Sequence, residues 1–128
     1  MKRFVAIYLG SATALAQWKA TDDQKRKELE KAGMDAWMKW VKENDASILD
    51  HGAPLGKTKR INPEGISDTK NEITAYTIVQ ADSHEAAAEL FANHPHFMIF
   101  PGQSVEVMEC LPLPENVNRE LGHLQASR

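Results

Sequence analysis

The alternation of apolar and polar positions along the chain predicts four main strands. Residues 4–9 and 71–81 alternate in side-chain direction, yet both predicted faces of each segment carry apolar or aromatic groups. Residues 103–110 alternate as well, and a shorter strand is predicted at residues 47–51. Because two of these strands are apolar on both sides, the sheet they form has to be covered on both faces.

Two longer segments have the 3.6-residue period of amphipathic helices. The first is predicted over residues 21–44, and Thr21 has the position of a capping-box residue. Its second half is apolar over a wide arc, which indicates burial under a loop, or else a subunit contact or pocket wall. The second long helix has Asp82 or Ser83 as its predicted cap. Residues 11–19 form a short helix or a lead-in to the first long helix.

The predicted elements follow the order strand, helix, strand, strand, helix, strand. This order is typical of a ferredoxin-like α+β fold, in which a four-stranded antiparallel sheet carries both helices on one face. The connection at residues 52–66 contains Gly and Pro, and a further strand piece is predicted near residues 57–61. We therefore expect a hairpin-like arm between the second and third main strands.

The chain is predicted to consist of one domain, residues 1–112, and a C-terminal tail, residues 113–128. Two spaced prolines keep the start of the tail extended, and a short helix can follow them. Val117, Leu121 and Leu124 have helix-compatible spacing. We expect the tail to lie over the domain or over a neighbouring subunit.

A ferredoxin-like sheet leaves one face free of helices, and this face is predicted to be apolar. Phe4, Tyr8, Tyr76 and Ile78 are expected on it. Such a patch is larger than soluble monomers usually expose, so a second copy of the chain is the expected cover. The sequence thus predicts a homodimer with a small-molecule pocket between sheet, helix and partner.

Composition and charge exclude several other classes of protein. The 128 residues carry a formal net charge of −3 with scattered Lys and Arg, so we expect neither nucleic acid nor a membrane as partner. The apolar run at residues 4–9 is too short for an export signal. Cys110 is the single cysteine, which favours a reducing compartment, and we expect a cytoplasmic protein.

Three stretches of this chain resemble the YCII-related domain family, including its DGPF-like branch. They read "ILDHGAPLG", "DTKNEITAYTIVQADSHEAAAELFANHP" and "GQSVEVMEC", in the order and spacing of the family. The resemblance covers most of residues 1–110. It implies a dimeric α+β barrel with a pocket.

The chain departs from that family at two places. The Asp-Gly-Pro-Phe motif is replaced by "NPEGIS" at residues 62–67. Members of the family often carry a histidine on or near the first helix, paired with an aspartate and proposed for acid-base work. Here no histidine precedes His51, so that pair has no counterpart.

Two histidines, His94 and His96, flank Pro95 at the predicted end of the second long helix. Asn93 tolerates a left-handed backbone and the residue before a proline avoids helix, so His94 is explained as part of a helix end. His96 is a candidate for proton transfer or ligand binding. Two histidines without a third ligand at diagnostic spacing do not make a metal site, and we predict no metal and no cofactor.

Asp50 and His51, at the end of a predicted strand, are the candidate pair that the sequence favours over His94 and His96. Gly52 allows the chain to turn there or to approach a ligand closely. Neighbours on a regular strand point to opposite faces, so a direct bond between the two side chains is not expected. The alternative is a polar turn with an exposed imidazole. Glu72 and Glu106 are further candidates for a general base.

The sequence contains no nucleophile elbow, phosphate loop or dinucleotide fingerprint. The predicted function is small-molecule binding, with cofactor-free acid-base catalysis of the lyase or isomerase type on a small polar or aromatic metabolite. A non-catalytic binding or interaction module and a monooxygenase-like dimeric barrel are the alternatives. The catalytic candidates are His51, Asp50 and His96, and the candidate ligand contacts are Tyr8, Trp37, Tyr76 and His94.

Overall fold

The computed structural model describes the backbone of residues 1–126 and the side chains of residues 1–122. The strands are β1 (Lys2–Leu9), β2 (Ile48–Asp50), β3 (Thr58–Asn62), β4 (Gly65–Thr69), β5 (Ile73–Ala81) and β6 (Ser104–Glu109). The helices are α1 (Ala12–Ala20), α2 (Asp23–Glu43), α3 (His84–Glu89), α4 (Pro95–Met98) and α5 (Glu115–Ala126), with a 3₁₀ turn η1 (Asp45–Ser47) before β2.

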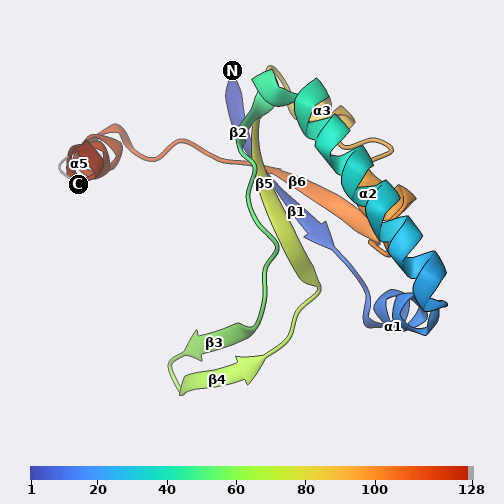
Figure 1. Ribbon diagram of the computed structural model, residues 1–128. Coiled ribbons are helices and arrows are strands. Elements are labelled where there is room, and N and C mark those ends of the chain that lie inside the picture. Colours follow the sequence, from blue (N-terminus) through green and yellow to red (C-terminus); the bar gives the residue numbers. More distant parts are fainter. Residues whose placement is uncertain (127–128) are drawn as a thin grey trace.

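The main sheet has the strand order β2-β5-β1-β6, and every neighbouring pair is antiparallel. The central pair places Val5 opposite Ile78 and Ile7 opposite Tyr76. Helices α2 and α3 lie on the same side of the sheet (Figure 1). The ferredoxin-like α+β fold predicted from the order of the elements is confirmed.

The core lies between this sheet and its helices. Phe4 and Tyr8 of β1 are fully buried there and pack with Trp40 of α2 and Phe91, which follows α3. The prediction that Phe4 and Tyr8 face outward is therefore wrong. Alternation shows that a strand has two faces, but both faces of β1 are apolar, so the pattern did not reveal which one the helices cover.

The helix-free face of the sheet has an apolar centre, made of other residues than predicted, and it also carries Arg3, Gln80 and Glu106. The partners in register on that side are Val5 with Ile78 and Ile7 with Tyr76, and all four are half-buried. Met108 of β6 lies opposite Val5 and is exposed.

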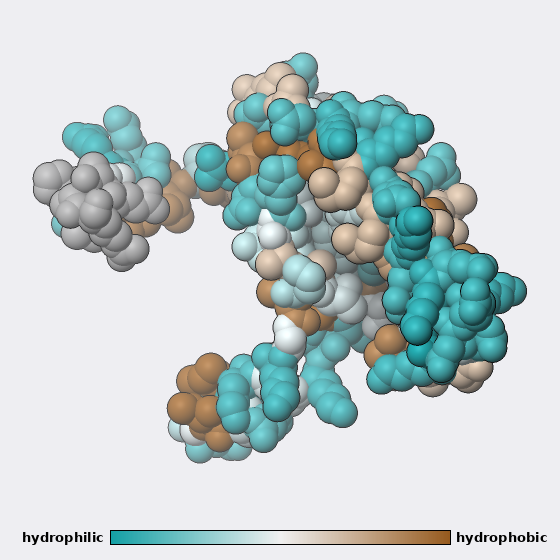
Figure 2. Space-filling model, in the orientation of Figure 1, coloured by the Kyte–Doolittle hydropathy of each residue, from teal (hydrophilic) through white to brown (hydrophobic). Residues whose placement is uncertain are grey.

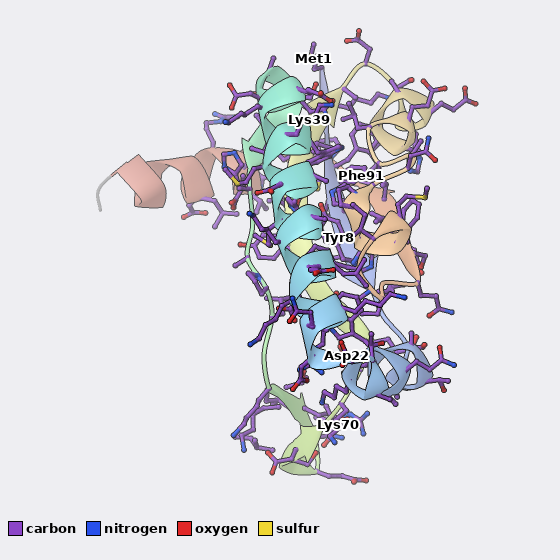
Figure 3. The ribbon with its side chains drawn as sticks, turned by 45° about the vertical axis from the view of Figure 1, so that its right-hand side comes forward. Met1, Tyr8, Asp22, Lys39, Lys70 and Phe91 are labelled. Carbon is purple, nitrogen blue, oxygen red and sulfur yellow. The ribbon has the colours of Figure 1, made fainter. Side chains whose placement is uncertain are left out.

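Helix α2 begins two residues later than predicted. Its cap is Asp22, at the start of the helix (Figure 3). Oδ2 of Asp22 accepts a hydrogen bond from the backbone N–H of Lys25 at 3.2 Å. Thr21 instead closes α1, because its hydroxyl donates to the carbonyl of Gln17 at 3.0 Å. A threonine between two helices can cap the end of the first or the start of the second, and Thr21 caps the end of α1.

Ser83, one of the two predicted caps, precedes helix α3, and its side chain accepts a hydrogen bond from the N–H of Ala86. It ends at Glu89, earlier than expected. Asn93 has the predicted left-handed backbone, with φ of 60°. The chain then starts the short helix α4, for which His94 is the cap.

Strands β3 and β4 form a separate two-stranded sheet, which is the predicted arm. It extends away from the main body (Figure 1), and its tip is apolar (Figure 2). Ile61 and Ile66 oppose each other near this tip and are 72% and 73% exposed.

Helix α5 also stands away from the sheet and from the other helices (Figure 1). Val117 and Leu121 are exposed on it. The expectation that the tail covers its own domain is therefore wrong, whereas its docking on a neighbouring subunit stays a prediction. The side chain of Leu124 lies outside the described residues. Within the described residues, no helix has the length and apolar character needed to cross a membrane.

Candidate functional site

The short helix α4 brings two histidines into different surroundings. Nδ1 of His94 accepts a hydrogen bond from the backbone N–H of His96 at 3.0 Å, which caps the helix. The His94 side chain is 0% exposed. Burial, and secondarily the neighbouring His96, lower the pKa of His94 to about 3, so it is uncharged at neutral pH. His94 was predicted as a ligand contact, but its full burial keeps it out of reach of a ligand.

His96 is 6% exposed and its ring is held by the backbone of a distant strand. Its Nε2 lies 2.8 Å from the carbonyl oxygen of Leu9. Because a carbonyl can only accept, Nε2 carries the proton, and in the neutral ring Nδ1 holds the free lone pair. Burial lowers the pKa of His96, against opposing backbone hydrogen bonds to Leu9 and Ser104. The ring is thus neutral at pH 7 and able to accept a proton.

Gly102 allows the chain to pass close to this ring. A Cβ atom at Gly102 would overlap both the His96 ring and the His96 carbonyl oxygen. The N–H of Gly102 donates to that same carbonyl at 2.8 Å. A glycine is therefore required where the chain returns from α4 to β6.

His96 lies at the boundary of two adjoining cavities of about 560 and 360 Å³, which also share Thr74 and Phe100. We call them together the cleft. The larger cavity is lined by Gly10, Ser11, Ala12, Leu15, Lys70, Asn71, Glu72, Thr74, His96, Phe100, Pro101 and Gly102. The smaller one is lined by Met34, Trp37, His51, Gly52, Ala53, Pro54, Thr74, Ala75, Tyr76, His96 and Phe100.

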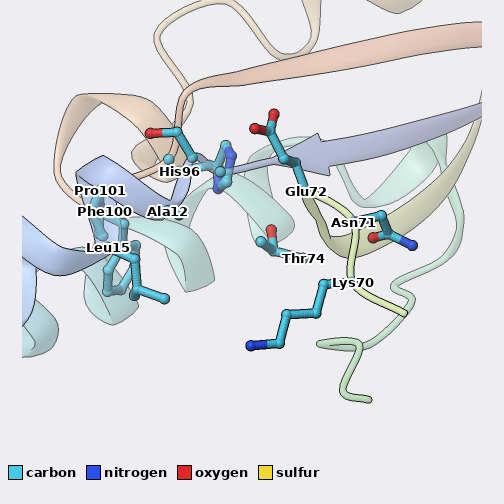
Figure 4. Close-up of a pocket in the computed structure, with 12 residues that line it drawn as sticks. Ala12, Leu15, Lys70, Asn71, Glu72, Thr74, His96, Phe100 and Pro101 are labelled. Carbon is cyan, nitrogen blue, oxygen red and sulfur yellow. The ribbon is translucent and has the colours of Figure 1, made fainter. Parts of the chain in front are cut away.

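The larger cavity has one apolar wall and one polar wall (Figure 4). The apolar wall is formed by residues from α1 and from the segment after α4: Ala12, Leu15, Phe100 and Pro101. The polar wall is formed by residues just before and at the start of β5: Lys70, Asn71, Glu72 and Thr74. The His96 ring stands between the two walls.

Four of the predicted site residues meet at the smaller cavity. They come from separate parts of the chain: Trp37 from α2, His51 from the segment after β2, Tyr76 from β5 and His96 from α4. The Tyr76 side chain lies on the helix-free face with Ile7, so Tyr76 lines the cavity with its backbone, next to Gly52. The spacing of these four residues along the sequence does not indicate that they line one cavity, because only the fold brings them together. The pocket wall that the wide apolar half of α2 indicated corresponds to Met34 and Trp37.

Asp50 and Tyr8 do not line the cleft. Oδ1 of Asp50 accepts a hydrogen bond from the N–H of Gly52 at 2.8 Å, so the carboxylate stabilises a turn. The Tyr8 hydroxyl lies 2.9 Å from Oγ1 of Thr77, which in turn donates to the carbonyl of His51 at 3.3 Å. Burial raises the pKa of Tyr8 to about 12. Both side chains support the backbone around the cleft.

Gly52 makes the turn that the sequence indicated, and its close approach is to the backbone of β5. Its φ is +72°, and a Cβ atom there would overlap the carbonyl of Tyr76. This contact holds the segment that carries His51 against β5.

The sequence did not single out Phe100, Thr74 or Lys70 as site residues. Phe100 belongs to the apolar run after His96, which also suits a core segment. Glu72, a suspected general base, lines the larger cavity, whereas Glu106 is exposed on β6 and lines neither cavity. Among the described residues, no group of three or more His, Cys, Asp or Glu side chains is placed to hold a metal ion.

The comparisons with known proteins support the fold. No family model matches the chain, and no curated protein matches it. A solved structure of the same class, an α+β fold of the ferredoxin-like type, is similar with a TM-score of 0.51 and 15% sequence identity. It is the 5-chloro-2-hydroxyhydroquinone dehydrochlorinase TftG from Burkholderia phenoliruptrix AC1100, in complex with 2,5-dihydroxybenzoquinone. The match covers 89% of this chain and 97% of that one.

Proposed function

We propose that this protein binds a small aromatic molecule with polar substituents in the cleft, and that His96 exchanges a proton with it without a cofactor. The observation that carries the proposal is a neutral imidazole, 6% exposed, between the aromatic side chains and the polar wall of one cleft. Reactions of the lyase or isomerase type begin with such a proton transfer.

The cleft suits an aromatic ligand in size and lining. Binding sites for small molecules usually have volumes of roughly 300–1,000 Å³ and apolar walls with a few polar groups. Here Trp37 and Phe100 offer flat apolar surfaces, and the hydroxyl of Thr74 can hydrogen-bond a substituent. The similar structure TftG holds 2,5-dihydroxybenzoquinone, a flat six-membered ring with polar substituents that resembles a substituted aromatic ring in size and shape, which supports the choice of ligand.

His96 is the stronger candidate for the base, and His51 is the second. The Leu9 carbonyl keeps the proton of neutral His96 on Nε2, so Nδ1 is the atom that accepts a proton from the ligand. His51 also lines the smaller cavity and is exposed. Neither ring has a hydrogen bond to a carboxylate within the described chain, so the proposal rests on burial and tautomer.

The protein is further proposed to act as a homodimer. Half-buried apolar residues form the centre of the helix-free face of the sheet, and the resemblance to YCII-related proteins implies a dimeric barrel. A second sheet packed on this face removes the apolar surface of Val5, Ile7 and Ile78 from water.

The binding proposal is tested with a thermal-shift screen of phenols, quinones and aromatic acids, including 2,5-dihydroxybenzoquinone. A ligand of the native state raises the melting temperature by mass action. Ala12→Trp fills the larger cavity from the exposed start of α1, and Ala16→Trp adds the same bulk on α1 outside it. Hits should stabilise the wild type and Ala16→Trp but not Ala12→Trp. Equal stabilisation of all three proteins would refute binding in the larger cavity of the cleft.

The chemical step is tested by following the exchange of carbon-bound protons of a hit for deuterium in D₂O. His96→Gln should abolish protein-dependent exchange, whereas His51→Gln should retain it. If His51→Gln abolishes exchange and His96→Gln does not, the roles are reversed. Absence of exchange with every bound ligand supports the alternative of a non-catalytic binding protein.

A further inference from the structure

His94 is attached to the proposed base through the backbone. As the cap of α4 it accepts the N–H of His96 on Nδ1, and its own carbonyl accepts from the N–H groups of Phe97 and Met98 at 3.2 and 3.1 Å. The N–H of His96 would otherwise be one of the unpaired donors at a helix start. The His94 side chain thus determines where the His96 backbone lies.

The His94 ring is itself held on several sides by aromatic side chains. Its centroid lies 4.5 Å from Trp37 and 4.6 Å from Trp40, at interplanar angles of 90° and 70°. The rings of Tyr8 and Phe91 lie 5.2 and 5.9 Å away. A ring packed in this way has little freedom to tilt, so its Nδ1 presents a lone pair in a constant direction.

An imidazole at this position has a cost that a smaller cap would avoid. Nε2 of His94 is buried without a hydrogen-bond partner among the described residues. Burying an unpaired polar group is unfavourable, whereas Ser, Asp or Asn caps a helix with a smaller side chain. The imidazole offers both an acceptor for the helix cap and a flat ring that fills the space between Trp37 and Trp40. Ser, Asp and Asn offer only the acceptor.

We propose that His94 is a positioning residue for His96. It fixes the backbone of His96 from one side while the Leu9 carbonyl fixes the ring from the other, and the two contacts together keep the imidazole between the walls of the cleft. This proposal rests on the proposed role of His96 as the base.

The test follows the His96 ring by ¹⁵N nuclear magnetic resonance in the ligand-free protein, comparing His94→Asn with His94→Leu. Asn places its side-chain oxygen near the position of Nδ1 and should retain the cap. Leu fills the space but offers no acceptor. The Nε2–H tautomer of His96 should persist in His94→Asn. In His94→Leu the signals should show mixed tautomers and a titration midpoint moved toward 6.5, the ordinary value.

A third variant keeps the test decisive if His94→Leu fails to fold. His94→Gln carries the same amide as His94→Asn, one bond further from the backbone, so it should disturb the His96 tautomer while His94→Asn preserves it. Identical His96 spectra in Asn, Gln and Leu variants and in the wild type would overturn the positioning role. Because no ligand is present, this result is independent of whether the cleft binds a small molecule.

Discussion

At the scale of single residues, two histidines one position apart have different roles because the fold buries them differently. Both have lowered pKa values, with burial as the main cause. His94 is enclosed by aromatic rings, whereas His96 lines both cavities of the cleft. A neutral histidine in contact with a cavity can accept a proton from a ligand, and an enclosed one can only support structure.

The burial of His94 predicts a pH dependence of stability. Its pKa is about 3 in the folded protein and 6.5 in an unfolded chain, so below pH 6.5 the unfolded state binds a proton that the folded state does not. Stability is full above pH 6.5 and falls as the pH drops toward 3. Between pH 7 and 5 the free energy of unfolding should decrease by about 2 kcal/mol from this group.

Urea unfolding at several pH values measures this decrease, with His94→Asn as the control. Most carboxyl groups titrate below pH 5 and contribute little in this interval. The variant should lose about 2 kcal/mol less than the wild type between pH 7 and 5. An equal loss in both proteins would show that His94 takes up its proton without unfolding.

At the scale of elements, the arm and the C-terminal helix stand apart from the body (Figure 1). An isolated hairpin is marginally stable in water, and so is a helix as short as the 12 residues of α5. Both carry exposed apolar side chains: Ile61 and Ile66 on the arm, Val117 and Leu121 on α5. Such elements gain stability when they dock on another surface.

Deletion of residues 115–128 tests the docking of α5. The helix stands away from its own domain (Figure 1), so its partner is expected to be a neighbouring subunit. The deletion should weaken the dimer in sedimentation velocity and lower the melting temperature by several degrees at micromolar concentration. Unchanged sedimentation together with unchanged melting would contradict a role for α5 in assembly.

At the scale of the whole molecule, the sheet has one face under the helices and one face without them, whose centre is apolar. Ile78→Asp places a charge at the centre of the proposed dimer interface and should cost several kcal/mol of association. Ala32→Asp adds the same charge on the exposed surface of α2 and should leave the dimer intact. Light scattering of both variants and the wild type gives the molar masses. A monomeric wild type would refute the dimer and the barrel it forms.

Local patterns in the sequence were sufficient to predict the fold. Alternation located β1, β5 and β6 to within two residues, and the Asn93–Pro95 stretch indicated a break after the second helix. These features depend on neighbours along the chain. Which face of β1 packs under the helices could not be predicted. Whether the Phe4 side or the Val5 side is covered depends on the residues that the distant helices place against the strand.

The candidate site was predictable only in part, for the same reason. The sequence indicates His51 and His96 as polar side chains at the ends of predicted elements. The environments that separate His96 from His94 come from Leu9 and from the aromatic residues of α2, more than 50 residues away along the chain. Phe100 and Thr74 carry no local signal, since an apolar run and a strand threonine are common in any core.

The most direct test of the central claim is a measurement of nuclear Overhauser effects between the tightest-binding hit of the screen and the protein. These effects report pairs of protons that lie close to each other in space, and a base must lie that close to its substrate. We expect contacts from the ligand to the ring protons of His96 and to Trp37 or Phe100, which line the cleft beside it. Contacts confined to the arm or to α5, with none to His96, would contradict that claim.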